Sequence, residues 1–143
     1  MPNSPDPYDL ARFVAAQDED IDQVMAELRA GRKSGHWMWY VFPQIRGLGH
    51  SSMASRFGIS SLAEAAAYLQ HPILGSRLRE CTRLVNLVER RSAAEIFGYP
   101  DNLKFRSSMT LFAQAAPGEL VFAEALGKYF GGQPDPPTLA RLS

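Results

Sequence analysis

Residues 31–52 hold a dense set of side chains that could bind an anion or transfer a proton. Their sequence, GRKSGHWMWYVFPQIRGLGHSS, contains two Trp, one Tyr, one Phe, two His and three cationic residues. No Asp or Glu lies between Leu28 and Ala63, although the chain has 15 acidic residues and a formal net charge of zero. This local excess of positive charge beside aromatic surface predicts a site for an anionic, planar or phosphorylated ligand.

The aromatic side chains of this segment have two possible roles. Trp37, Trp39 or Tyr40 could stack on a ring of the ligand. Alternatively, all of them belong to the hydrophobic core, because each aromatic side chain buries about 150–250 Å². Two residues apart on a helix, Trp37 and Trp39 point in different directions, so we expect one to enter the core and the other to meet a groove.

The polar residues around the aromatic run supply the rest of the predicted site. Gln44 and Arg46 would contact the ligand, with Arg46 bound to its negative charge. The glycines that follow free the loop backbone, so that its N–H groups could turn toward an anion. If the protein is catalytic, His36 or His50 would transfer the proton, because histidine changes charge near neutral pH.

A second group of candidates follows Asp101 in the segment KFRSSMT. Lys104, Ser107 and Ser108 fall on one face of the first turns of a predicted helix, where free N–H groups attract anions. Arg106 would add positive charge. The alternative for the hydroxyl side chains is structural, since small hydroxyl residues allow close helix contacts and bond back to the backbone.

Established catalytic templates do not match the chain. The sequence has no G-x-S-x-G elbow, phosphate-binding P-loop, H-E-x-x-H or G-x-G-x-x-G motif. The acid-free segment offers no carboxylate to complete a metal site with its histidines, so we predict no metal. Cys81 lies on a predicted apolar stripe, where cysteine is an inert small hydrophobe. The reaction, any cofactor and the oligomeric state stay open.

Hydrophobic periodicity is helical along nearly the whole chain. It predicts an all-α fold: a single domain of about seven or eight helices, with the helix 73–90 as a central packing element. We interpret residues 37–42 as a short helical turn closed by Pro43, because a single strand would have no partner with which to form a sheet. Residues 43–52 are predicted to form the longest internal loop.

Length and composition predict one domain over residues 1–143, with loosely held ends at about 1–7 and 132–143. The single cysteine excludes an internal disulfide and fits a reducing compartment, so we expect a cytoplasmic, soluble protein. No apolar run reaches the ~18 residues of a membrane span, and the polar N-terminus is unlike a signal peptide.

Several sequence blocks resemble one family. The blocks GRKSGHWMW (31–39), FPQIRGLG (42–49), YLQHPILG (68–75) and KFRSSMTLF (104–112) are similar to the family catalogued as domain of unknown function 1810. The resemblance extends from about Tyr8 to Tyr129. It implies a compact, all-helical bacterial protein and implies no activity. Some members carry the label calpastatin, which would be a disordered, repeat-bearing chain and does not fit these blocks.

We therefore expect a pocket for a phosphate- or carboxylate-bearing ligand, nucleotide-like or otherwise, in which Arg46, Lys104 and Arg106 converge. The first alternative is a protein-interaction module, because Trp, Tyr and Arg are enriched at interface hot spots. The second is nucleic-acid binding through the same residues, against which the zero net charge of the chain argues.

Overall fold

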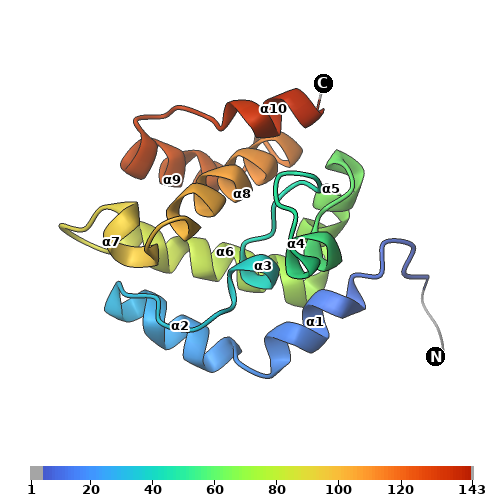
Figure 1. The fold of residues 1–143 in the computed structure, drawn as a ribbon, viewed down its shortest axis with the longest axis horizontal. Helices are drawn as coiled ribbons and strands as arrows, with labels where there is room; N and C mark the ends of the chain where they lie inside the picture. The colour runs from blue at the N-terminus through green and yellow to red at the C-terminus, as the bar shows by residue number, and fades with distance from the viewer. Residues whose placement is uncertain (1–4, 143) are drawn as a thin grey trace.

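The computed structural model describes residues 5–142, and within them every regular element is a helix. Figure 1 shows how these helices enclose a single core. In chain order the helices are α1 (Ala11–Asp18), α2 (Ile21–Ala30), α3 (Met38–Val41), α4 (Ser52–Phe57), α5 (Leu62–Gln70), α6 (Pro72–Leu87), α7 (Ala93–Phe97), α8 (Asp101–Ala115), α9 (Leu120–Phe130) and α10 (Pro136–Leu142).

The prediction of an all-helical single domain is confirmed, but the described residues form ten helices rather than seven or eight. Helix α4 begins at the last residue of the predicted 43–52 loop and otherwise covers residues to which we assigned no element; Ser51 caps it by accepting a hydrogen bond from the Ala54 N–H. Helix α10 lies in the proline-rich tail. Both helices have at most seven residues, too few for a clear 3.6-residue pattern in the sequence.

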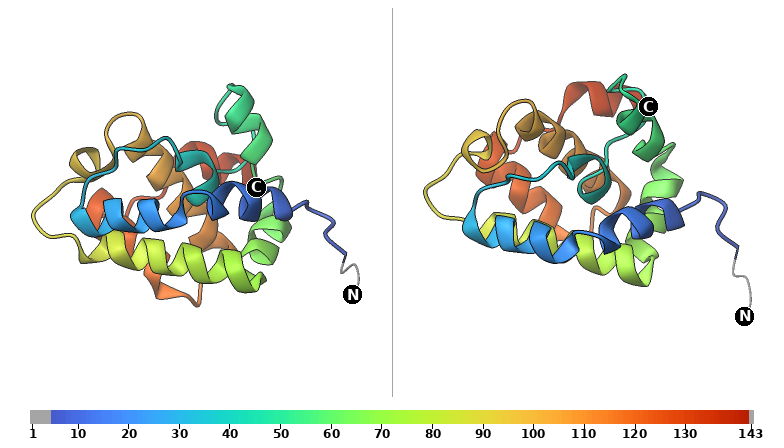
Figure 2. Two further views of the ribbon diagram at one scale, coloured as in Figure 1. Left: turned by 90° about the horizontal axis from the view of Figure 1, so that it is seen from below. Right: turned by 60° about the horizontal axis from the view of Figure 1, so that its bottom comes forward.

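Helix α6 occupies the centre of the fold and packs against α1, α2, α5 and α9. Figure 2 shows α2 beside α6 in both views. His71 caps the start of α6, because its Nδ1 accepts hydrogen bonds from the Ile73 and Leu74 N–H groups, and Pro72 occupies the first helical position. Gly75 allows α6 to approach the end of α5: an added Cβ would lie 2.1 Å from the Leu69 carbonyl oxygen.

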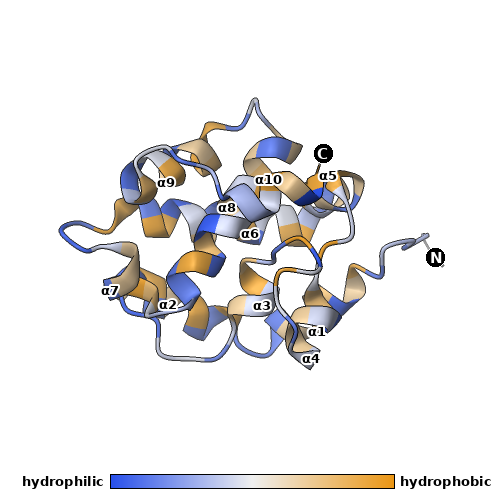
Figure 3. Ribbon diagram, turned by 45° about the horizontal axis from the view of Figure 1, so that its top comes forward, coloured by the Kyte–Doolittle hydropathy of each residue, from blue (hydrophilic) through white to orange (hydrophobic). Residues whose placement is uncertain are grey.

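The core is built from the apolar faces of these helices. Figure 3 shows that the longer helices carry both hydrophobic and hydrophilic residues along their length. Phe42, Phe97 and Phe105 meet at its centre, with ring centroids 4.6–5.9 Å apart. Phe13 and Tyr68 form a second aromatic contact where α1 meets α5. Aromatic pairs at these separations add stability beyond the area that they bury.

The two ends of the chain are held more firmly than we expected from the sequence. Residues 1–4 and 143 lie outside the described residues, but Asp6 accepts hydrogen bonds from the Leu10 and Ala11 N–H groups and so begins α1. In the tail, Asp135 caps α10 through Thr138, and Arg106 of α8 binds two backbone carbonyls of the tail. The tail is ordered by contacts with α8, which local composition does not reveal.

Candidate functional site

The first part of the acid-free segment is a turn held by a buried carboxylate. Glu27 of α2 is 6% exposed, and its Oε1 accepts hydrogen bonds from the Ser34 N–H (2.8 Å), the Gly35 N–H (3.0 Å) and the Trp37 Nε1 (2.9 Å). Its Oε2 accepts a fourth from Gln23. Burial opposes ionisation of Glu27, but these donors outweigh it and lower the pKa to about 2.

This arrangement assigns Trp37 to the core. The indole is 1% exposed, its N–H is used by Glu27, and the Lys33 ammonium lies 5.1 Å from the ring centroid. Tyr40 is also interior, with its hydroxyl donating to Asp20 at 2.6 Å. Burial and the Asp20 carboxylate raise the Tyr40 pKa. Neither ring is open to stack on a ligand.

His36 and His50 are both exposed, on either side of the aromatic run. Neither is hydrogen-bonded or ion-paired to another described residue. No group of three His, Cys, Asp or Glu within residues 5–142 is placed to hold a metal ion. Cys81 is buried on α6, and burial raises its pKa to about 12, so the thiol is not a nucleophile in the folded protein.

Trp39 is half-buried and lies against α8. The Lys104 ammonium is 5.1 Å from its ring centroid and 3.4 Å from Asp101 Oδ1. The other oxygen of Asp101 is 2.8 Å from the Lys33 ammonium. Two lysines, each over a tryptophan, therefore share one carboxylate, and this group keeps a net charge of +1.

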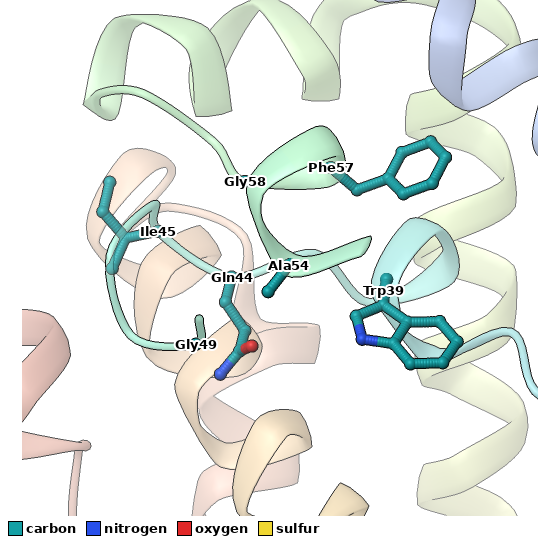
Figure 4. Close-up of a pocket in the computed structure, with 7 residues that line it drawn as sticks. All are labelled: Trp39, Gln44, Ile45, Gly49, Ala54, Phe57 and Gly58. Atoms are coloured by element: carbon teal, nitrogen blue, oxygen red, sulfur yellow. The ribbon is translucent and has the colours of Figure 1, made fainter. Parts of the chain in front are cut away.

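Figure 4 shows the hollow beside Trp39, between the loop after α3 and helix α4. Its volume is about 10 Å³, about the space that a single water molecule needs. Gln44, Gly49 and Ala54 close it, while the Phe57 side chain points away from Gln44. The hollow is therefore too small to admit a ligand ring beside the indole.

A larger groove, which we call the α8 groove, continues from Gln44 and Gly49 toward α8 and the tail. Its volume is about 250 Å³. Gln44, Lys104 and Ser107 all line it, together with Leu103, Asp135 and Pro137. The fold thus brings Gln44 together with Lys104 and Ser107, two predicted site residues that lie about 60 positions further along the sequence.

Arg46 lies on another side of the molecule. Ile45 forms an isolated parallel bridge with Ile59, which points Ile45 into the core and leaves Arg46 exposed. Arg46 lines an open cavity of about 410 Å³, which we call the arginine groove. Its wall also includes Arg12, Arg56 and two carboxylates, Asp9 and Glu64, so the charged side chains that line it sum to +1; Pro7, Tyr8 and Ser60 complete it.

Arg12, which the sequence analysis did not select, organises this groove. Its guanidinium donates to the carbonyl oxygens of Tyr8, Asp9, Arg56 and Gly58 and forms an ion pair with Glu64 at 3.0 Å. Glu64 is 2% exposed and also accepts the Ser60 N–H and hydroxyl. No local signal identifies Arg12 as part of the groove, because its partners Arg56, Gly58 and Glu64 lie 44–52 residues away in the sequence.

Arg56 rests on the core, with its guanidinium carbon 5.0 Å from the Phe57 ring centroid. Arg46 donates to the Gly58 carbonyl at 3.4 Å. Within residues 5–142, neither Arg46 nor Arg56 forms an ion pair with a carboxylate. The positive charges of these two guanidinium groups are therefore not paired with a carboxylate, and most of their N–H donors are available to a ligand.

The remaining candidates on α8 have structural contacts. Arg106 donates to the carbonyl oxygens of Gln133 and Pro134, each at 3.0 Å, and so holds the tail. The Ser107 hydroxyl lies 3.1 Å from the Leu103 carbonyl and 2.9 Å from Asp135 Oδ2. Ser108 is fully buried, and its hydroxyl has no hydrogen-bond partner among residues 5–142. Ser107 and Arg106 anchor the tail, in accordance with the structural alternative.

The expected convergence of Arg46, Lys104 and Arg106 on one cavity is therefore corrected. Arg46 lines the arginine groove, Lys104 lines the α8 groove, and Arg106 is directed to the tail. The bridge between Ile45 and Ile59 holds the loop after α3, and the two sequence neighbours of Ile45 line different cavities: Gln44 the α8 groove and Arg46 the arginine groove. None of the described helices has the length and hydropathy to cross a membrane.

Comparisons with known proteins place the chain in a family. No curated protein sequence matches it. A solved structure, the conserved hypothetical protein Rv1873 from Mycobacterium tuberculosis, is 61% identical, with a TM-score of 0.95 over 96% of this chain and 98% of that one. The family model for the protein of unknown function DUF1810 matches residues 7–142, and the chain therefore belongs to the DUF1810 family.

Proposed function

We propose that this protein binds a small anionic ligand, bearing a phosphate or a carboxylate, in the arginine groove. The proposal rests on which of the three arginines in the groove are already paired with protein acceptors. Arg12 is fully used by protein acceptors, whereas Arg46 and Arg56 face the same open cavity with no carboxylate partner among the described residues. Unpaired guanidinium groups that line one cavity raise its positive potential, and an anion bound there is stabilised by both.

The surroundings support a preorganised site. Arg12 binds the carbonyl oxygens of Arg56 and Gly58, so it fixes the turn that carries Arg56 and that Arg46 contacts. The Arg56 guanidinium lies near the face of Phe57, an arrangement that leaves the N–H groups at its edge for hydrogen bonds. Planar guanidinium groups bind carboxylate and phosphate oxygens in pairs, with shorter and stronger hydrogen bonds than neutral donors.

The size of the groove limits the ligand. A volume of about 410 Å³ corresponds to roughly fourteen water molecules at about 30 Å³ each. This volume admits a small ligand such as a sugar phosphate or a dicarboxylate. Neither His36 nor His50 lines it, so the proposal concerns binding rather than catalysis.

The alternative of a protein-interaction module loses its support at the residues that suggested it. Trp37 and Tyr40 are buried, and Trp39 lies under the Lys104 ammonium, so the segment presents no flat aromatic patch. Nucleic-acid binding stays the least favoured alternative, because the chain has 15 basic and 15 acidic residues.

A thermal-shift screen tests the proposal with inorganic phosphate, sugar phosphates, dicarboxylates and nucleotides, since a ligand that binds the native state raises Tm. The Kd of any hit is then measured for Arg46→Gln, Arg56→Gln and the control Arg29→Gln on exposed α2. We expect Kd to rise about tenfold or more for each groove variant, because a charge-assisted hydrogen bond contributes about 1.5–3 kcal/mol. Failure of the whole panel to stabilise the protein, or equal Kd values in all variants, would refute it.

A further inference from the structure

The α8 groove has charges of both signs that do not neutralise each other. Lys104 and Ser107 are three residues apart on α8 and so share one face of the helix, and Ser107 holds Asp135 at 2.9 Å. Lys104 and Asp135 therefore line the same wall, yet they form no ion pair with each other. The nearest carboxylate to Lys104 is Asp101, at 3.4 Å, and that carboxylate is bound more closely by Lys33.

Asp135 keeps one oxygen free. Within the described residues, every hydrogen bond that the Asp135 side chain accepts goes to Oδ2. The donors are the Ser107 hydroxyl, the Thr138 hydroxyl at 2.6 Å and the Thr138 N–H at 3.3 Å. Its Oδ1 accepts no hydrogen bond from residues 5–142. A carboxylate of this kind has an acceptor available for a cationic group of a ligand.

The rest of the groove combines one polar group with an apolar wall. The Gln44 side chain lines it and is not hydrogen-bonded to any described residue. Leu48, Pro100, Leu103 and Pro137 supply aliphatic surface, and Leu103 is 46% exposed. The volume of about 250 Å³ corresponds to roughly eight water molecules, which is room for a small ligand of amino-acid size.

We propose that the α8 groove binds a free aliphatic amino acid as a zwitterion. The α-carboxylate binds the Lys104 ammonium and the Gln44 amide, the α-ammonium binds Asp135 Oδ1, and the aliphatic side chain covers Leu103 and its apolar neighbours. Each charge of the ligand then meets the opposite charge of the protein. The α8 groove shares no lining residue with the arginine groove, so this inference does not depend on the function proposed there.

The experiment is an NMR titration with L-leucine that follows the indole N–H signal of Trp39, assigned with Trp39→Phe. Lys104 lies 5.1 Å from that ring, so its movement onto a carboxylate shifts the signal. N-acetyl-L-leucine lacks the ammonium and L-leucinamide lacks the carboxylate. We expect L-leucine to shift the Trp39 signal and both derivatives to bind at least tenfold more weakly.

Two variants test the assigned contacts without removing a helix cap. Asp135→Asn keeps the cap of α10, because Asn and Asp cap helices equally well, but it removes the charge. Lys104→Met keeps the aliphatic stem. Each is expected to raise Kd for L-leucine at least tenfold, whereas the control Arg29→Gln, which lines neither groove, should leave Kd unchanged. The inference is overturned if L-leucine leaves the Trp39 signal in place, if the blocked derivatives bind equally well, or if both variants keep the wild-type Kd.

Discussion

Glu27 allows the most demanding test of the structure, because a single carboxylate holds the turn before Trp37. Its pKa is lowered from the usual 4.5 to about 2, so the ionised form is favoured in the folded protein. A lowered pKa stabilises the fold fully above pH 4.5, and the contribution is lost as the pH falls from 4.5 toward 2. Protonation of Glu27, or its replacement by Gln, removes this contribution.

The magnitude follows from the two pKa values. At about 1.4 kcal/mol per pKa unit, the ionised carboxylate contributes about 3 kcal/mol to the free energy of unfolding at neutral pH. The linkage relation gives a loss of about 2 kcal/mol by pH ~3. Because a domain has only about 5–15 kcal/mol of stability, a loss of this size is measurable.

The assay is urea unfolding, followed by tryptophan fluorescence, between neutral pH and pH ~3. We expect Glu27→Gln to be less stable than wild type by up to about 3 kcal/mol at neutral pH, and the gap to narrow by about 2 kcal/mol at pH ~3. Glu124→Gln, on the exposed side of α9, is the control and should follow wild type. If the difference in the free energy of unfolding between Glu27→Gln and wild type is the same at every pH, the reasoning is refuted, since the charge of Glu27 then contributes nothing.

Two further predictions concern packing. Gly75→Ala places a Cβ 2.1 Å from the Leu69 carbonyl oxygen, so we expect a loss of about 1–3 kcal/mol or more in urea unfolding. Gly127→Ala, on exposed α9 with no atom within 4 Å of the new Cβ, should instead stabilise by about 0.4–1 kcal/mol; equal effects at the two positions would contradict the close approach of α5 and α6. Cys81, with its pKa raised to about 12 by burial, should react with iodoacetamide only after unfolding, and rapid labelling of the folded protein would contradict its place in the core.

Much of the fold could be predicted from local pattern. Gly31 ends α2 in the left-handed conformation, with φ 71°, as its place after an apolar stripe predicts. Ser92 and Glu95 have the S-x-x-E spacing of a capping box and form that box at α7. Ser61 and Glu64 have the same spacing, but only half of the box forms there, because the Glu64 carboxylate binds Ser60 and Arg12 instead. That ion pair crosses 52 residues and has no local signature.

The candidate site was only partly predictable. The local excess of positive charge selected Arg46, which is exposed in the structure, but it did not reveal that Arg12 lines the same groove or that Lys104 lines a different one. The aromatic residues looked equally suited to a ligand or to the core. For Trp37 the structure shows the core role, because its indole N–H donates a hydrogen bond to buried Glu27 at 2.9 Å.

The sequence by itself determined that the chain is helical, where most helices begin and end, and which family it belongs to, because capping, glycine termination and apolar spacing act over a few residues. Only the tertiary structure decided which cations share a groove. The side chains of Arg12, Arg46 and Arg56 come together because α1, the bridge at Ile45 and the turn after α4 pack against one another. Contacts of that kind depend on distances through space, which spacing along the chain does not encode.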